Sequence, residues 1–336
     1  MHNLNHNKSN SVQKQKTLIA IVGPTAVGKT QLAVELAQLF SCEIISTDSR
    51  QFYKEMSIGT AKPTAIEMKG IPHHFINNLS IKDDYSAGQY EIEALKKLEE
   101  LFLSNDYTIA VGGSGLFVNA LCFGLDDIPS VSSSVREKWN TEWETRGAGY
   151  IQEKVKEIDP KYFNKVDINN KHRLLRALEV WDESGKKLSE IQQNKVVKRP
   201  FNIVFIGLNE ERSVLYNRIN KRVDLMLKNG LLSEVKSLKQ FKNLNPLRTV
   251  GYQEFYDLSN YDKENHTGTS EKIEFQFENE SVKSAVELIK RNSRRYAKRQ
   301  ITWFKKMPGI TWFSIKNIES DAKKIQKLIL DLSKTD

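Results

Sequence analysis

The sequence has few cysteines and no long apolar run. Its 336 residues include two cysteines, Cys42 and Cys122. Two thiols exclude a framework of several disulfides and a cysteine-rich zinc site, and we expect both to be buried and reduced. No apolar run approaches the ~20 residues that a membrane-spanning helix needs. The polar residues 1–16 lack the apolar stretch of a signal peptide, so we expect a disordered tail on a cytoplasmic protein.

Charge is distributed unevenly along the chain. The net charge is +9, but residues 1–150 hold 14 Lys and Arg against 17 Asp and Glu, a net of −3. Residues 151–336 hold 37 against 25, a net of +12. An excess of one sign indicates a polyanionic partner. Solvated helix faces are the alternative, and the positions of the charges must decide between the two.

Short apolar runs alternate with amphipathic segments in the first part of the chain. The runs at 17–23, 43–46 and 108–113 predict buried strands, and residues 85–102 have helical spacing. This alternation predicts an α/β fold, in which a P-loop NTPase-like parallel sheet carries helices on both faces.

The pattern changes in the second part. Residues 126–198 are charged and mostly helical in pattern, and residues 201–208 form one more core strand. We therefore expect residues 17–125 and 199–336 to form the α/β core with C-terminal helices, and residues 126–198 to form an inserted helical domain. Residues 259–280 are acidic and weakly apolar, which predicts a surface insertion.

A phosphate-binding loop follows the first predicted strand. Residues 23–30, GPTAVGKT, match the pattern G-x-x-x-x-G-K-[ST] and lie between a strand and a helix. In such a loop, backbone N–H groups and the helix N-terminus bind phosphate. Lys29 contributes a mobile positive charge, and Thr30 offers a hydroxyl ligand to Mg²⁺. The strand–loop–helix order argues against an ordinary glycine turn.

The position of the acidic residues separates this loop from those of most nucleotide hydrolases and kinases. Those enzymes usually place a metal-binding Asp after an apolar strand. Here the strand at 108–113 leads into glycine and Ser114, whereas Asp48 follows the strand at 43–46. Because the carboxyl ends of parallel strands border the ligand crevice, Asp48 is expected near the phosphate loop, facing a second reactant. Its spacing is equally compatible with a helix cap. His73 and His74 follow a proline, and we interpret them as structural.

The strongest cluster of positive charge lies at residues 281–306, with nine basic residues and one acidic residue. The basic pairs recur every four residues, which predicts one basic stripe on a helix: Lys290/Arg291, Arg294/Arg295 and Lys298/Arg299. Tyr296, Trp303 and Phe304 add aromatic rings, and this combination suits folded RNA. Arg173 and Arg176 share a face of another predicted helix, where solvated charges are the simpler explanation.

Together these segments resemble the bacterial tRNA dimethylallyltransferases, also called tRNA isopentenyltransferases. The resemblance runs from about Thr17 to Lys306 through GPTAVGKT, STDSRQFYKEMSIGTAKP, PHHF, YSAGQY, VGGSGLF, NNKHRLLRALEVW, RINKRVDLMLKNGLLSEV, RTVGYQE and AKRQITWF. It implies a monomeric enzyme that transfers the dimethylallyl group of dimethylallyl diphosphate to the exocyclic amine of adenosine 37, beside the anticodon of tRNA. The phosphate loop would then hold the diphosphate of a prenyl donor.

The resemblance also implies roles for individual residues. The diphosphate would lie against Gly23, Pro24, Thr25, Ala26, Val27, Gly28, Lys29 and Thr30, with Mg²⁺ at Thr30. Asp48 would act on the adenine amine, and Arg218 would neutralise the leaving diphosphate. The implied tRNA contacts are Asp48, Ser49, Arg50, Gln51, Ser114, Arg136, His172, Arg173, Leu174, Leu175, Arg176, Arg248, Thr249, Val250, Gly251, Tyr252, Gln253, Lys298, Arg299, Gln300 and Trp303.

One position of the phosphate loop departs from the family pattern, because Val27 replaces the usual serine. The inserted domain would close over the anticodon stem-loop. Two other hypotheses stay open on the residues alone. The first is a P-loop kinase that consumes ATP, and the second is an RNA-binding module in which the phosphate loop is a relic.

Overall fold

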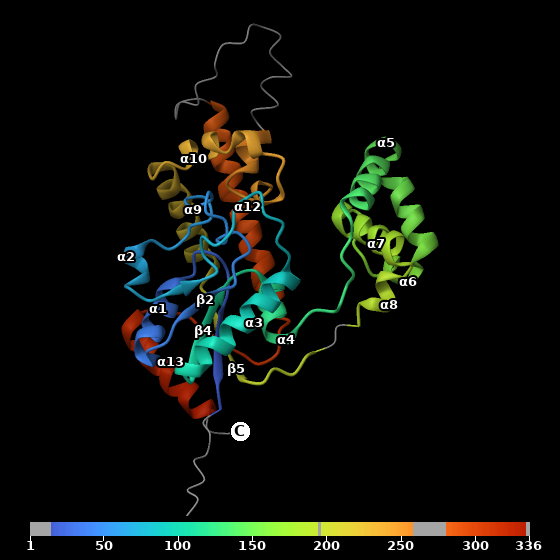
Figure 1. Ribbon diagram of the computed structural model, residues 1–336. Coiled ribbons are helices and arrows are strands. Elements are labelled where there is room, and N and C mark those ends of the chain that lie inside the picture. The colour runs from blue at the N-terminus through green and yellow to red at the C-terminus, as the bar shows by residue number, and fades with distance from the viewer. Residues whose placement is uncertain (1–14, 194–195, 258–279, 334–336) are drawn as a thin grey trace, which may run out of the picture. The chain divides into compact units, whose positions relative to one another are not determined.

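The computed structural model describes residues 15–193, 196–257 and 280–333. Within these residues the chain forms two compact units, which comprise the described parts of 1–122 with 199–336, and of 123–198 (Figure 1). Most of the predicted disordered tail and almost all of the predicted acidic insertion lie outside the described residues.

The larger unit is built on a six-stranded parallel sheet (Figure 1). Its order is β3-β2-β4-β1-β5-β6, with β1 (Thr17–Val22), β2 (Ile44–Ser46), β3 (His73–His74), β4 (Tyr107–Gly112), β5 (Asn202–Leu208) and β6 (Ile310–Phe313). The central strand β1 pairs along its whole length with β4 on one side and β5 on the other. Every residue of β1, β2 and β4 is buried, as expected for a sheet covered on both faces. The predicted α/β class is therefore confirmed.

The helices of this unit are α1 (Lys29–Phe40), α2 (Ala65–Met68), α3 (Ala87–Ser104), α4 (Gly115–Phe123), α9 (Arg212–Lys228), α10 (Leu231–Ser237), α12 (Glu280–Phe304) and α13 (Ile318–Leu332). Apolar side chains of α1 and α13 form one core with those of β1, β4 and β5. A second core joins α9, α10 and α12 to the segment around Tyr252. The second core supports the loops that line the pocket described below.

Two strands were not anticipated from the sequence. The PHHF segment supplies the edge strand β3, and the C-terminal part adds β6 before the last of the predicted C-terminal helices, α13. His74 Nε2 lies 2.6 Å from Glu43 Oε2, and His73 Nδ1 lies 2.8 Å from the carbonyl oxygen of Ile71. Burial lowers the pKa of His73. These contacts agree with a structural role for both histidines.

The regular secondary structure of the smaller unit is all helical within its described residues. It contains α5 (Ser133–Ile158), α6 (Pro160–Phe163), α7 (Lys171–Ser184) and α8 (Leu188–Ile191). Gly147 interrupts α5 with a left-handed conformation, φ 78°, that suits glycine. Side chains of α5 and α7, including Trp139, Ile151 and Leu178, form a separate core. The unit starts at Phe123, three residues before the predicted boundary at Asp126.

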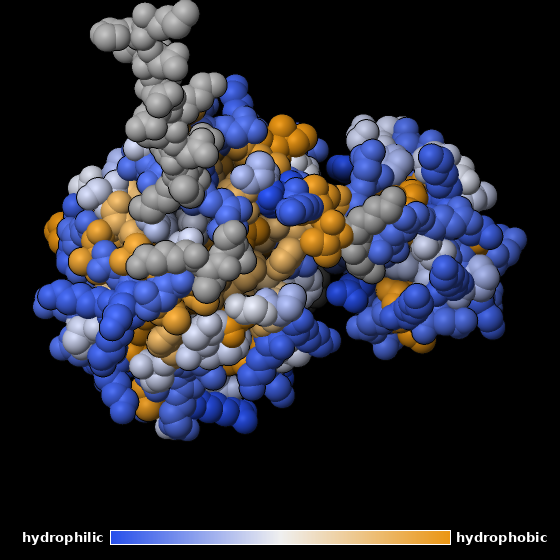
Figure 2. Space-filling view, turned by 90° about the horizontal axis from the view of Figure 1, so that it is seen from below, coloured by the Kyte–Doolittle hydropathy of each residue, from blue (hydrophilic) through white to orange (hydrophobic). Residues whose placement is uncertain are grey.

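Hydrophilic residues dominate the surface visible in Figure 2, with hydrophobic residues in the areas between them. Among the residues that the structure describes, no helix is both long and apolar enough to cross a membrane.

Candidate active site

The phosphate loop has the backbone geometry that its glycines predict. Gly28 adopts φ 102° as the N-cap of α1, and Gly23 adopts φ 145°. A Cβ atom at Gly23 would lie 2.4 Å from the carbonyl oxygen of Leu208, so only glycine fits between the loop and β5. The loop therefore opens onto the N-terminus of α1, where unpaired N–H groups favour an anion.

The Lys29 ammonium group folds back over the loop and donates a hydrogen bond to the Pro24 carbonyl oxygen at 2.7 Å. Burial is the main cause that lowers its pKa to about 7, and the nearby Arg222 guanidinium acts in the same direction. The Asp48 carboxylate opposes both effects. A second anion bound at the loop would favour the charged lysine.

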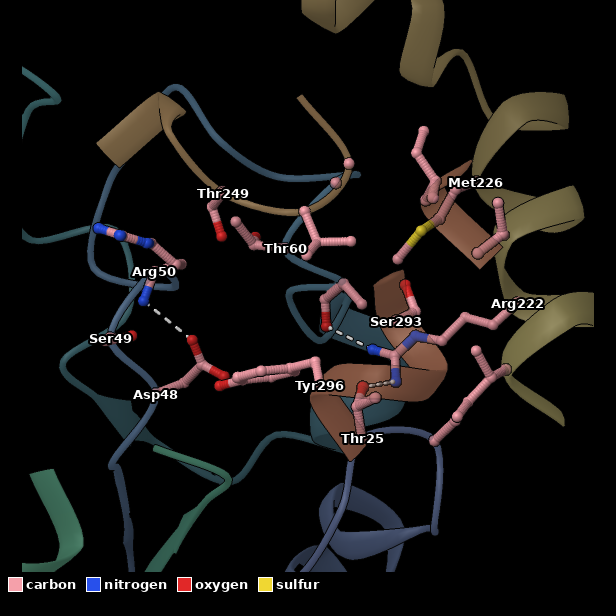
Figure 3. Close-up of a pocket in the computed structure, with 18 residues that line it drawn as sticks. Thr25, Asp48, Ser49, Arg50, Thr60, Arg222, Met226, Thr249, Ser293 and Tyr296 are labelled. Carbon is pink, nitrogen blue, oxygen red and sulfur yellow. Dashed lines mark hydrogen bonds between the residues drawn. The ribbon is translucent and has the colours of Figure 1, made fainter. Parts of the chain in front are cut away.

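Asp48 lies where β2 ends, as predicted, and its carboxylate has a structural partner. Oδ1 accepts a hydrogen bond from the Arg50 N–H at 2.9 Å (Figure 3). Asp48 therefore shapes the turn after β2 and also lines the pocket. No helix begins at Asp48, so the helix-cap alternative is wrong. One carboxylate oxygen instead holds the turn after β2, and the residue also lines the cavity.

Ser114 joins the ends of β2 and β4. Its hydroxyl accepts a hydrogen bond from the Ser49 N–H at 3.0 Å and lies 3.1 Å from the Ser49 hydroxyl. Tyr296 of α12 also hydrogen-bonds with Ser114, and its ring points toward Asp48 (Figure 3). Burial and the Asp48 charge raise the pKa of Tyr296 to about 12. The phenol therefore stays protonated beside the carboxylate.

A cavity of about 230 Å³ connects the phosphate loop to Asp48. Thr25, Asp48, Arg50, Thr60 and Arg222 line its polar part, and apolar side chains of α9 and α12 line the remainder, namely Ile219, Val223, Met226 and Ile289. Thr249, Val250 and Gly251 close it from the loop that precedes Tyr252. Figure 3 shows Thr25 and Asp48 at different walls of this cavity.

Arg222 of α9 lines the pocket, whereas Arg218, the predicted partner of the diphosphate, does not. Arg222 Nη1 lies 3.4 Å from Thr25 Oγ1, and Nη2 lies 3.4 Å from the Ala61 carbonyl oxygen. Arg218, one helical turn earlier, is exposed and pairs with Glu210 at 3.4 Å. We therefore transfer the predicted role at the diphosphate from Arg218 to Arg222. The two arginines share the face of α9, so spacing alone could not separate them.

Gln300 had been predicted as a tRNA contact, but it is buried against the phosphate loop. Its Oε1 accepts a hydrogen bond from the Thr25 N–H, and its Nε2 donates to the Gly113 carbonyl oxygen, both at 2.9 Å. A Cβ atom at Gly113 would lie 2.2 Å from that nitrogen. Gln300 thus ties α12 to the phosphate loop and to the end of β4.

The other predicted tRNA contacts differ in how far their side chains are exposed. Three side chains are buried in the apolar cores and cannot contact RNA, namely Leu174, Leu175 and Tyr252. Exposed side chains remain available at Arg136, His172, Arg173, Arg248, Lys298, Arg299 and, at 41% exposure, Trp303. Gln51, Gln253 and Arg176 are partly buried, and Arg176 Nη2 donates to the Pro129 carbonyl oxygen at 3.1 Å.

The basic residues of α12 do not form one stripe. Lys290 pairs with Asp224 of α9 at 2.9 Å, and Arg294 donates a hydrogen bond to Asn220 at 2.7 Å. These two therefore fasten α12 to α9. The exposed cations of α12 are Lys283, which pairs with Glu280, and Arg291, Arg295, Lys298 and Arg299.

The fold and this pocket define an α/β protein of the P-loop type, in which the phosphate loop lies at the same cavity as a carboxylate. A sequence model of the family described as IPP transferase matches residues 51–307. The tRNA dimethylallyltransferase of Christiangramia forsetii is 45% identical over 296 residues, which cover 88% of this chain and 92% of that protein. The tRNA dimethylallyltransferase of Flavobacterium johnsoniae is 44% identical over 304 residues, or 89% and 93% of the two chains.

Solved structures agree with these relatives. The tRNA isopentenylpyrophosphate transferase of Bacillus halodurans is 36% identical with a TM-score of 0.66, covering 95% of this chain and 97% of that one. A eukaryotic dimethylallyltransferase solved acting on tRNA is 28% identical with a TM-score of 0.71, covering 94% and 78%. The chain belongs to the IPP transferase family.

Proposed function

We propose that the protein transfers the dimethylallyl group of dimethylallyl diphosphate to the exocyclic amine of adenosine 37 in tRNA and releases diphosphate. The observation that carries this proposal is the single cavity that joins the phosphate loop to the Asp48 carboxylate. The strand β4 ends at Gly112 and is followed by Gly113 and Ser114, so the metal-binding acid of a nucleotide hydrolase is missing there.

The donor side of the pocket stabilises charge separation. As the allylic carbon–oxygen bond breaks, positive charge grows on the allyl group and negative charge grows on the diphosphate. The N–H groups at the start of α1, the Lys29 ammonium and the Arg222 guanidinium surround the position of that negative charge. Donors that are fixed in advance favour the transition state because they need no reorganisation.

The acceptor side must activate a weak nucleophile, since the lone pair of the adenine amine is delocalised into the ring. Asp48 accepts a hydrogen bond or the proton from this amine, and such help typically contributes about 10²–10⁴ in rate. The Tyr296 hydroxyl beside it stays neutral, because burial and the Asp48 charge raise its pKa. The adenine has to leave its stack to enter the cavity.

Magnesium fits the donor end of the site. The Thr30 hydroxyl lies in the first turn of α1, and no intramolecular hydrogen bond engages it within the described residues. The same residues contain no group of three or more His, Cys, Asp and Glu that could hold a metal by themselves. Mg²⁺ would therefore bind Thr30 together with diphosphate oxygens and water, and it would neutralise charge on the leaving group.

The tRNA contacts come from exposed basic side chains. On α12 these are Arg291, Arg295, Lys298 and Arg299, and on the smaller unit they are Arg136, His172 and Arg173. Lysine and arginine bind the phosphates of RNA and release counterions. We also propose that the protein acts in the cytoplasm as a monomer.

A transfer assay tests the proposal. The protein is incubated with a tRNA transcript, labelled dimethylallyl diphosphate and Mg²⁺, and a transcript with guanosine at position 37 serves as control. We expect label on the first transcript and none on the second. ATP consumption without labelled tRNA would instead support the kinase, and tRNA binding without turnover would support the RNA-binding module.

A further inference from the structure

Glu234, on the short helix α10, lies outside the lining of the cavity but bonds to both loops that form it. We infer that Glu234 is a positioning residue, which fixes residues 57–61 and residues 249–252 around the reacting groups. The inference rests on the function proposed above.

The first loop is held through its backbone. Glu234 Oε2 accepts hydrogen bonds from the N–H groups of Ser57 at 2.9 Å and Ile58 at 2.8 Å, and Oε1 accepts one from Gly59 at 2.9 Å. Three successive N–H groups thus converge on one carboxylate, which is the geometry of an anion-binding nest. An ionised acceptor makes such bonds stronger than a neutral one.

The second loop is held through a side chain. The Tyr252 hydroxyl donates a hydrogen bond to Glu234 Oε1 at 2.6 Å. The ring of Tyr252 is fully buried, and a Cβ atom at Gly59 would lie 2.5 Å from it. The two loops are therefore in direct contact at Gly59, and the same carboxylate bonds to both.

The loop that Glu234 fixes contacts the catalytic guanidinium. Residues 59–61 line the cavity, and the carbonyl oxygen of Ala61 accepts hydrogen bonds from Arg222 Nη2 at 3.4 Å and from Gln51 Nε2 at 3.3 Å. Ala61 has φ 47°, a conformation that a non-glycine residue keeps only where its surroundings impose it. Release of residues 57–59 would let this carbonyl move, and Arg222 would lose the group that orients it.

The test replaces Glu234 with glutamine, which keeps the size but presents one acceptor and one donor to four donor groups. We expect Glu234→Gln to lower kcat about 10- to 100-fold, because at least one N–H of the loop is left without an acceptor. The dissociation constant for tRNA should change less than about threefold, since the hydrogen-bond partners of Glu234 lie in the two loops and not among the exposed cations of α12. Tyr252→Phe removes one of the four bonds and should lower kcat less.

The matched control is Val235→Ala on the same helix. Val235 is buried in the apolar core, so its truncation lowers stability without removing a bond to either loop. We expect a lower Tm for Val235→Ala with kcat near the wild-type value. If both variants lose kcat in proportion to their lost Tm, Glu234 is only a stabilising residue and the inference fails.

A double-mutant cycle with Arg222→Gln tests the route through the guanidinium. If Glu234 acts through Arg222, Glu234→Gln should lower kcat less than about threefold in the Arg222→Gln background. Fully additive losses would overturn the inference. Because the wild-type enzyme is assayed beside every variant, failure of the proposed function shows as no transfer at all and is distinguishable from this outcome.

Discussion

Lys29 makes donor binding dependent on pH in a direction that the structure determines. Burial and the neighbouring Arg222 lower the pKa of Lys29 to about 7 in the free protein. The charged form is therefore about half populated at pH 7 and falls to about 1% at pH 9. If the diphosphate binds beside Lys29 as proposed, it favours the charged lysine, and affinity for the donor should decrease as pH rises above 7, by up to about tenfold per pH unit.

The assay is calorimetric titration of the protein with dimethylallyl diphosphate, in the presence of Mg²⁺ and without tRNA, between pH 6.5 and pH 9. Over this range the charged fraction of Lys29 should change about 100-fold. Lys29→Arg is the control, because a guanidinium stays charged throughout this range. The ionisation of the donor itself affects both proteins equally, so it cancels when the affinity of Lys29→Arg is divided by that of the wild type. We expect this ratio, Lys29→Arg over wild type, to rise with pH.

Arg222→Gln gives a second check on the same cause. Removing the neighbouring positive charge should raise the pKa of Lys29 and move the onset of the affinity loss to higher pH. If wild type and Lys29→Arg lose affinity in parallel, the lysine is charged at every pH tested. The reasoning from burial and charge at the phosphate loop is then refuted.

Three further predictions concern the acceptor side, the loop support and the RNA surface. Asp48→Asn keeps an acceptor for the Arg50 N–H but removes the charge, so kcat should fall about 10²–10⁴-fold while tRNA affinity stays within about threefold; retained turnover would contradict the role. Gly113→Ala should displace Gln300 and raise the KM for the donor about tenfold. Adding Gln300→Ala to this variant should raise the KM little further. Additive increases in KM would show that Gly113 does not act through Gln300. Replacing Arg291, Arg295 or Lys298 of α12 by alanine should lower the salt slope of tRNA binding by about 1 each. Lys290→Ala should leave the slope unchanged. Filter binding at several salt concentrations measures the slopes, and equal slopes for all four variants would contradict the prediction.

The core of the fold could be predicted because its signals are local. A buried parallel strand such as β1 is a continuous apolar run, and the phosphate loop has fixed residues at fixed spacing. β3 and β6 are short and lie at the two edges of the sheet, where burial is incomplete and the apolar signal is weak. Edge pairing depends on tertiary contacts that no local pattern contains.

The site residues that follow strands could be predicted from the sequence, whereas those on helices α9 and α12 could not. Asp48, Lys29 and Thr25 lie where strand–loop order indicates, because the carboxyl ends of parallel strands meet at one edge. The choice between Arg218 and Arg222 depends on where α9 lies against the phosphate loop. Gln300 follows exposed Arg299 directly in sequence, and only the packing of α12 shows that it is buried.

The pairing of the central strand β1 also indicates which part of the larger unit is most resistant to local unfolding. It is bonded on both sides from Thr17 to Val22, and the phosphate loop continues directly from it. Amides of such a strand exchange with solvent only when the whole unit unfolds. We therefore expect the amides of β1 to be among the slowest to exchange in the larger unit, so that the phosphate loop continues from a part of the fold that rarely opens.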